Sequence, residues 1–405
     1  MNKEQEMERI VKRKKILLIV TSASDVFIYN MAKWLKKSMD CTLDAFELCP
    51  SSTANQESGY SSFFNIVETA QWSSWWGQNR ITRFICSPVK IAQQLDRFVS
   101  DKHYDVIHVH GVWFYVPLTR ELKKHTEKLF VSFWGIEYKG GEIWRSHSLY
   151  EKKNRDFIDS VDGIVGTKAR FKELSIWFPN TKMYQASLGA ASMDAIVSLT
   201  QTRTKEESKQ YWNIPVNKIT VLIGYSGKSL HNHLEIISAF NNHPELVDYI
   251  HFLAPMTRGA ESSDYINDVE NALKSSPYSY TLLKDRFLTD EDVAQLRYAT
   301  DIVFQFATSD AYSRSIIECI CAGAILIYGD WINYKELLAD DHFEAFVANN
   351  IERGIEILHD YISSQDKYKK ISNQNIKCGG KKYLWSECIK DWVDIYNGVK
   401  NAEVF

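Results

Sequence analysis

The sequence lacks the features that mark several large classes of protein. Its formal net charge is only -3 at pH 7, so nothing suggests that it binds nucleic acid in bulk. No hydrophobic run approaches the length of a membrane-spanning helix. The N-terminal segment, residues 1–24, has only a short apolar part, ILLIV, which is typical of a strand and not of a signal peptide. We therefore expect a cytoplasmic protein.

Cysteine is scarce and irregularly spaced. The chain holds seven cysteines, an odd number. Cys319 and Cys321 are two positions apart in an apolar run, unlike the CxxC pairs of metal or redox sites. We predict buried free thiols in a reducing compartment.

Alternation of strand-like and helical segments is what the sequence has in abundance. The run KKILLIVTSAS is followed by DVFIYNMAKWLKKSM, whose apolar residues have helical spacing, and the same rhythm recurs along most of the 405 residues. Such alternation predicts parallel sheets covered by helices. A polar segment, SLTQTRTKEESKQYWNIPVNK, separates two units of this kind.

We expect two Rossmann-like domains with parallel sheets, facing each other across a cleft. The N-terminal domain is predicted at 1–195, the C-terminal domain at 196–380 and a closing helix at 381–405. In open α/β sheets, ligands bind outside the carboxyl ends of the strands. Candidate chemistry should therefore follow strand ends such as LLIV, IHVH, VLIG and IVFQFA.

The stretch SDAYSRSIIECICAGAILIYGD, residues 309–330, contains two acids that need explanation. Asp310 and Glu318 have seven residues between them, and Glu318 lies in an apolar run. A buried carboxylate without a partner is costly, so Glu318 requires one. An acid that merely favours a helix N-terminus is the alternative, and it suits Asp310 better than Glu318.

These stretches together resemble the glycosyltransferases of the GT-B fold, especially those of family 4. That family carries two acids with seven residues between them at the start of a helix, followed by small residues and a glycine, as do Asp310, Glu318 and Gly323 here. YLWSECIKDWVDIYNGV resembles the family's closing helix, which crosses back to the N-domain. FVSFWGIEY resembles a strand end of bacterial sugar transferases, and GYSGKSLHNHLEII resembles a loop of the lipid-linked fucosamine-type enzymes.

The resemblance implies a nucleotide-sugar-dependent hexosyltransferase. It would transfer a sugar to a glycan, a lipid-linked or another glycoconjugate acceptor in bacterial surface polysaccharide synthesis. The resemblance favours transfer with retention of configuration at the sugar. In the family, the first acid lies near the transferred sugar and the second accepts hydrogen bonds from the ribose. Two departures stand out: the first acid is Asp310 where Glu is usual, and Ser226 stands where the family has a diphosphate-binding arginine.

Donor-binding candidates lie in two loops. The turn before the helix of Glu318 would offer backbone N–H groups and side chains to a diphosphate; its residues are Tyr312, Ser313, Arg314 and Ser315. A cation after VLIG would neutralise charge on the leaving diphosphate; the candidates there are Gly224, Ser226, Lys228, His231 and His233. A capped helix start and surface histidines are the alternatives.

Acceptor-binding candidates lie in the N-terminal domain. His110 ends the predicted strand IHVH, and Trp134 and Glu137 follow the strand LFVSF, where Trp134 could stack on a sugar and Glu137 act as a base. The loop after LLIV adds Ser22, Ser24 and Asp25. Catalytic roles are predicted for Asp310, Glu318, His110 and Glu137. A sheet-end histidine with a purely structural role is an equal alternative for His110.

No cofactor is expected beyond the nucleotide-sugar substrate, of UDP, GDP or dTDP type. No cysteine or aspartate completes a compact zinc ligand set around the histidines, so we expect no metal. The segment QWSSWWGQNRITRF either fills the core of the N-terminal domain or contacts a glycan or the inner face of a membrane; it holds Trp72, Trp75, Trp76, Arg80 and Arg83.

Two other functions stay open. One is a nucleotide-sugar epimerase on the same fold, which would need no acceptor groove. The other is a catalytically inactive GT-B partner or binding subunit. The missing arginine and the altered first acid favour the inactive subunit, whereas Glu318 and the basic loop argue against it.

Overall fold

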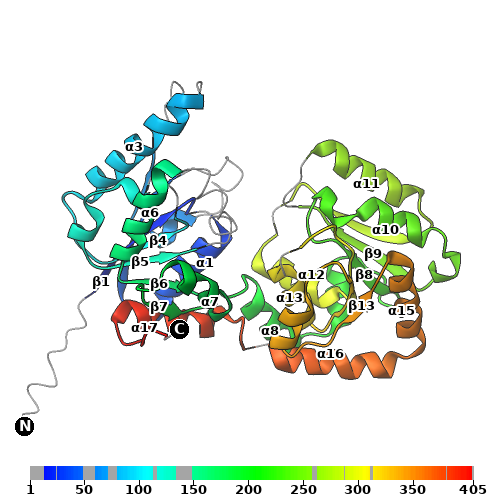
Figure 1. Cartoon of the computed structure of the whole chain (residues 1–405). Helices are drawn as coiled ribbons and strands as arrows, with labels where there is room; N and C mark the ends of the chain where they lie inside the picture. Colours follow the sequence, from blue (N-terminus) through cyan, green and yellow to red (C-terminus); the bar gives the residue numbers. More distant parts are fainter. Residues whose placement is uncertain are drawn as a thin grey trace, which may run out of the picture. The chain divides into compact units, whose positions relative to one another are not determined.

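The computed structural model describes residues 13–23, 25–48, 60–71, 80–112, 116–133, 148–257, 262–286, 288–310, 313–379 and 381–403. The chain divides into two compact units, which we call unit 1 (Met1–Gly189 with Trp385–Phe405) and unit 2 (Ala190–Leu384). Each unit is built on one parallel sheet flanked by helices, as the alternating sequence pattern predicted (Figure 1). The assignment of unit 1 to the acceptor and unit 2 to the donor stays a prediction.

Unit 1 has a seven-stranded sheet in the order β3-β2-β1-β4-β5-β6-β7. Every residue from Ile16 to Val20 on the interior strand β1 is buried, which explains its unbroken apolar run. The strands are β1 (Lys14–Val20), β2 (Cys41–Glu47), β3 (Ile66–Thr69), β4 (Tyr104–His110), β5 (Thr126–Ser132), β6 (Gly163–Gly166) and β7 (Met183–Gln185).

The helices of unit 1 include the C-terminal helix of the chain. Trp385, Trp392 and Tyr396 of this helix, α17, are buried in the same hydrophobic core as Ile28 and Met31 of α1. The long helices are α1 (Val26–Ser38), α3 (Arg80–Val99), α6 (Ser148–Ser160), α7 (Lys168–Trp177) and α17 (Trp385–Asn397); the short 3-10 helices are η2 (Tyr60–Phe63), η3 (Val116–Leu118) and η4 (Leu122–His125).

Unit 2 has a six-stranded sheet in the order β10-β9-β8-β11-β12-β13. Its strands are β8 (Ile219–Ile223), β9 (Ile250–Pro255), β10 (Ser279–Leu283), β11 (Ile302–Gln305), β12 (Ile325–Gly329) and β13 (Phe346–Ala348). Its helices are α8 (Met193–Thr202), α9 (Lys205–Tyr211), η5 (Ser229–His231), α10 (His233–Phe240), η6 (Pro244–Leu246), α11 (Ser263–Ser275), α12 (Asp290–Ala299), α13 (Arg314–Cys321), α14 (Lys335–Asp340), α15 (Ile351–Ser363) and α16 (Gln365–Gly379).

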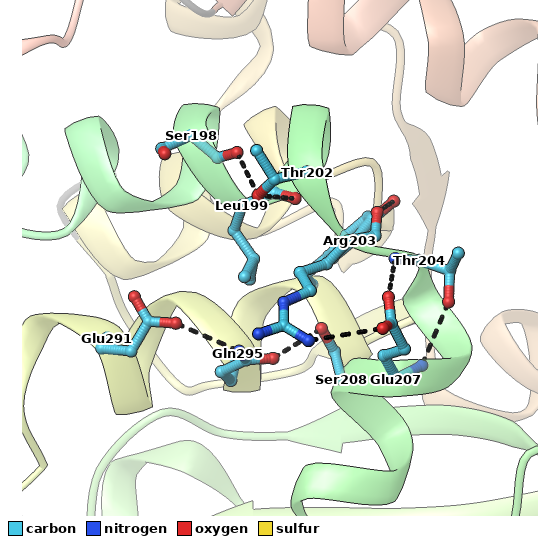
Figure 2. A network of polar contacts seen from close by, with 10 residues as sticks. Ser198, Leu199, Thr202, Arg203, Thr204, Glu207, Ser208, Glu291 and Gln295 are labelled. Atoms are coloured by element: carbon cyan, nitrogen blue, oxygen red, sulfur yellow. Dashed lines mark hydrogen bonds and ion pairs between the residues drawn. The ribbon is translucent and has the colours of Figure 1, made fainter.

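Local capping fixes the start of α9, the second helix of unit 2. The Thr204 hydroxyl accepts a hydrogen bond from the Glu207 backbone N–H, and the Glu207 carboxylate accepts one from the Thr204 N–H, which forms a capping box at the start of α9. One turn later, the Ser208 hydroxyl donates to the Gln295 side chain of α12 at 2.8 Å (Figure 2). These contacts tie α9 to α12 and serve the fold.

Strand order reverses once in each sheet. In unit 1, β2 and β3 lie on one side of β1, and β4 to β7 lie on the other. The reversal is therefore between β1 and β4. In unit 2 it lies between β8 and β11. A crevice opens outside the carboxyl ends of the strands at such a switch point, and it is where open α/β sheets bind ligands.

The cysteines and the apolar segments largely meet expectation in the described part of the chain. Cys41, Cys319 and Cys321 are buried free thiols as predicted, and Cys388 is buried as well, whereas the free thiol of Cys378 is exposed. Among the described residues, no helix combines the length and the hydropathy needed to cross a bilayer. Trp72, Trp75 and Trp76 lie outside the described residues, as do the side chains of Arg80 and Arg83, so membrane contact stays a prediction.

Candidate functional site

The loops after β8 and β11 are joined to each other at the switch point of unit 2. The Thr308 N–H donates to the Leu230 carbonyl at 2.8 Å. The Asn232 side-chain amide donates to the Phe306 carbonyl at 2.7 Å, from a backbone in the left-handed region with φ 57°. These bonds bring the predicted donor-binding residues after β8 beside the loop after β11, which leads to the second predicted segment.

Asp310 is the centre of this site. Its Oδ1 accepts a hydrogen bond from the Tyr225 phenol at 2.8 Å, and its Oδ2 accepts from the Tyr334 phenol. The Gln305 amide at 3.2 Å and the Ser313 backbone N–H at 3.5 Å also point to Oδ2. Asp310 as a whole residue is only partly buried. Its orientation is therefore fixed by several donors, while the residue as a whole keeps some exposure to solvent.

Both phenols act as donors to Asp310 and stay protonated. Burial first, and then the neighbouring Asp310 carboxylate, raise the pKa of Tyr225 well above its usual range. Burial and the hydrogen bond to Asp310 raise the pKa of Tyr334 in the same way. Sequence reasoning missed these tyrosines. Both follow strand ends, in LIGYSG after β8 and in DWINY after β12, and that position was the available indication.

His231 and His233 are buried, and they are not the cations that we expected. The Ser226 hydroxyl lies 2.9 Å from Nε2 of His231, and the Tyr265 hydroxyl lies 3.1 Å from Nδ1 of His233. Burial lowers the pKa of His231 to about 4 and that of His233 to about 3. At neutral pH both rings are uncharged, so the positive charge of this loop comes from the exposed Lys228.

Gly224, a predicted donor-binding residue, makes room for the two histidines. Its φ is +73°, and a Cβ at this position would lie 2.5 Å from Nε2 of His233 and 2.9 Å from Cβ of His231. Any other residue would therefore clash with the rings and strain the backbone. The glycine allows β8 to end directly against the start of α10.

The start of α13 uses several of its polar groups within the protein. The Ser313 hydroxyl accepts from the Ser315 backbone N–H at 3.1 Å and caps the helix. The Arg314 guanidinium lies over the Tyr383 ring, 4.7 Å from its centre. Tyr312 lies outside the described residues. Phosphate binding at this helix start stays a prediction.

Glu318 has a protein partner that the sequence did not reveal. Its side chain is 6% exposed, and its Oε2 lies 3.2 Å from Nε of Arg297, which is 7% exposed. The Ser192 backbone N–H, at the start of α8, lies 3.4 Å from Oε1. This buried ion pair answers the need for a partner without a ribose. The predicted contact of Glu318 with a ribose is untested.

Trp331 is a further residue at this edge that sequence reasoning missed. Its indole N–H donates to the Ala307 carbonyl at 2.7 Å, which links the loop after β12 to the loop after β11. Its ring lies against Gly329, where an added Cβ would approach the ring to 2.5 Å. The residue is nevertheless 46% exposed. The site thus has a rigidly held, half-exposed aromatic surface.

In unit 1, a buried carboxylate organises the loop after β1. Glu47, at the end of β2, accepts hydrogen bonds from the Ala23 N–H at 2.7 Å, the Ser22 hydroxyl at 3.2 Å and the Thr69 hydroxyl at 2.7 Å. The predicted acceptor residue Asp25 caps α1 by accepting from the Phe27 N–H at 2.9 Å. Sequence reasoning missed Glu47, although it ends a strand. Another predicted residue, Ser24, lies outside the described residues.

His110 is 1% exposed at the end of β4. Its ring stacks on that of His108 with centres 4.2 Å apart, so both side chains point to one side of the strand as predicted. Burial lowers the pKa of His110 to about 3, so the ring is neutral at pH 7 and shielded from solvent. This arrangement favours the structural alternative for His110. Trp134 and Glu137 lie outside the described residues.

His108 anchors the C-terminal helix to the sheet of unit 1. Its Nδ1 lies 2.8 Å from the Tyr396 hydroxyl, and its Nε2 lies 2.9 Å from the Ser132 hydroxyl. Ser132 donates its own proton to the Val165 carbonyl at 2.8 Å. Nε2 must therefore carry the proton of the ring, and Tyr396 donates to Nδ1. These bonds hold α17 in unit 1.

No protein-family model matches the chain, and no curated protein matches it in sequence. Solved structures do match. A glycosyltransferase from Rickettsia africae ESF-5 is 14% identical, covers 95% of this chain and 98% of its own, and has a TM-score of 0.67. Anabaena HepE, solved in complex with UDP-glucose, is 12% identical with coverages of 95% and 100% and a TM-score of 0.62.

A third similar structure is the UDP-GlcNAc 2-epimerase from Neisseria meningitidis, bound to UDP-GlcNAc. It is 16% identical, with coverages of 95% and 100% and a TM-score of 0.62. Structural similarity at such low sequence identity indicates a shared fold and does not identify the reaction. The two parallel-sheet units and these matches together show that the chain has the GT-B fold found in glycosyltransferases.

Proposed function

We propose that the protein is a nucleotide-sugar-dependent glycosyltransferase whose donor site lies at the carboxyl ends of β8, β11 and β12. The observation that carries the proposal is Asp310, a partly exposed carboxylate held at the switch point by two phenols from separate loops. A fixed acceptor at that position suits a sugar hydroxyl. HepE, which has the same fold, was solved with UDP-glucose, which supports a nucleotide sugar as the donor.

We assign the site residues the following roles. Asp310 would position the transferred sugar and stabilise positive charge that develops on it. The exposed Lys228 would offset charge on the leaving diphosphate. Trp331 would pack against a flat face of the donor. Transfer with retention, to a glycan or lipid-linked acceptor in bacterial surface polysaccharide synthesis, remains the finer part of the proposal.

A nucleotide-sugar epimerase is the second candidate. The observation in its favour is the likeness to the Neisseria epimerase, which is as extensive as the likeness to HepE. An epimerase would convert the donor without any acceptor. The two functions therefore differ in one measurable requirement.

The test is to incubate the protein with UDP-, GDP- and dTDP-sugars and to follow nucleotide release with and without glycan or lipid-linked acceptors. Acceptor-dependent release supports the transferase, and an isomerised donor supports the epimerase. Asp310→Asn should lower turnover by about 100-fold to 1000-fold. Asp248→Asn, which alters an exposed acid of unit 2 just before β9, is the matched control. Equal activity in both variants would remove Asp310 from the site, and failure to bind or turn over any nucleotide sugar would overturn both enzymatic functions.

A further inference from the structure

Four side chains converge in unit 2 that the proposed transfer reaction does not use. His243 comes directly before η6, and Glu245 is the second residue of η6. Glu352 and His359 lie seven positions apart on α15, so both project from one face of that helix. The helices α10 and α15 share one hydrophobic core, which brings the segment after α10 against α15.

The distances within this cluster approach those of a metal site. Oε1 of Glu245 lies 3.1 Å from Nδ1 of His243 and 3.3 Å from Nε2 of His359. One possible ligand atom from each of the three side chains lies within 4.8 Å of the other two. With metal–ligand bonds of about 2.0–2.2 Å, tetrahedral geometry separates neighbouring ligand atoms by about 3.4 Å. Two of the three separations already have that size.

The other nitrogen of His243 has the partner that a metal-bound imidazole needs. Nε2 lies 2.8 Å from Oε2 of Glu352. A histidine that binds a metal through one nitrogen usually donates its other N–H to a carboxylate, which fixes the tautomer and the orientation of the ring. Glu352 therefore directs the lone pair of Nδ1 toward Glu245 and His359.

We propose that His243, Glu245 and His359 bind a divalent transition-metal ion, with Glu352 orienting His243. Two imidazoles and a carboxylate suit zinc, and such a set leaves a fourth position for water. The three side chains are 24%, 54% and 42% exposed, so an ion can enter from solvent. The bound ion clips the segment after α10 to α15. The site is independent of the proposed transfer reaction.

This site departs from our expectation that the protein holds no metal. His243 and Glu352 are 109 positions apart in the sequence, so no compact motif marks them. Without an ion, the same groups form ion pairs. A metal ion binds the deprotonated imidazole, so its binding releases protons.

The experiment uses the full chain without a histidine tag, first treated with a chelator and then titrated with Zn²⁺ and Co²⁺. Calorimetry should give one Zn²⁺ per chain with proton release, and Co²⁺ should give the intense visible absorption of a four-coordinate ion. His359→Gln should weaken Zn²⁺ binding by more than 100-fold. Glu352→Gln should weaken it by about 10-fold to 100-fold, because the ligands remain but His243 loses its orientation.

His342→Asn is the matched control, because it removes an exposed histidine of the same unit and asparagine tolerates the left-handed backbone at φ 57°. It should bind Zn²⁺ as the wild type does. Circular dichroism checks that each variant is folded. Binding only at millimolar Zn²⁺, or equal affinity in the wild type and His359→Gln, would overturn the site. Unchanged affinity in Glu352→Gln would overturn the role of that carboxylate.

Discussion

The two switch points contain similar residues but use them differently. Each has a carboxylate among hydroxyl and backbone donors, and each has two buried, neutral histidines two positions apart, His108 with His110 and His231 with His233. Glu47 of unit 1 is 4% exposed, and its carboxylate is bound by the loop after β1 and by Thr69 of β3. Asp310 of unit 2 is equally well held but partly exposed. Access to solvent therefore separates an acid that builds the fold from one available to a ligand.

The largest effect is expected at Glu318, whose buried ion pair resembles the structural case of Glu47. Glu318→Ala leaves Arg297 buried without its counter-charge, so it should lower the free energy of unfolding by about 3–5 kcal/mol. Urea denaturation measures this loss. The double variant Glu318→Leu with Arg297→Met should recover much of it, because no charge is then buried alone. A loss below about 1 kcal/mol in Glu318→Ala would indicate that the pair is open to water.

Glu47→Ala tests the structural side of the comparison. It removes the acceptor for the buried Ala23 N–H and for two hydroxyls, so stability should fall by about 1–3 kcal/mol. Asp310→Asn, by contrast, keeps an acceptor and should change stability less than turnover. Urea denaturation of both variants, with an activity assay, provides the measurement. Equal stability losses in the two variants would show that Glu47 and Asp310 contribute to the fold in the same way.

The histidine pairs predict how stability depends on pH. Their pKa values are lowered in the folded state, so the unfolded chain binds more protons below pH 6.5. The stability contributed by the neutral histidines should be fully present above that pH. The free energy of unfolding should then fall as the pH drops toward 4, by about 2 kcal/mol per histidine between pH 6.5 and 5. Unfolding curves at several pH values measure the slope, and His110→Phe should flatten it. A slope unchanged in that variant would mean that His110 titrates normally.

The smallest effect is expected when one donor to Asp310 is removed. Tyr334→Phe deletes one hydrogen bond and leaves the Tyr225 and Gln305 donors in place, so turnover should fall roughly tenfold, about 1.4 kcal/mol. A positioning role predicts that kcat falls more than KM rises. Tyr249→Phe, at an exposed tyrosine just before β9, is the control and should behave as the wild type. Unchanged kcat in Tyr334→Phe would show that Tyr334 does not hold Asp310 for catalysis.

The sequence by itself determined the alternation of strands and helices, the break between two units and the strand ends at which polar residues gather. These features are local, since periodicity and turn residues act over a few neighbours. It also placed Asp310 and Glu318 on opposite sides of a helix start. What it did not reveal were their partners.

Only the tertiary structure decided which groups pair. Tyr225 reaches Asp310 across 85 positions, Arg297 reaches Glu318 from another helix, and His243 meets Glu352 across 109 positions. Strand order brings such groups together, and no local spacing encodes it. Burial, which makes the histidines neutral, likewise depends on packing around them. The sequence thus indicated where chemistry could occur, and long-range packing decided the charge and the orientation of the groups found there.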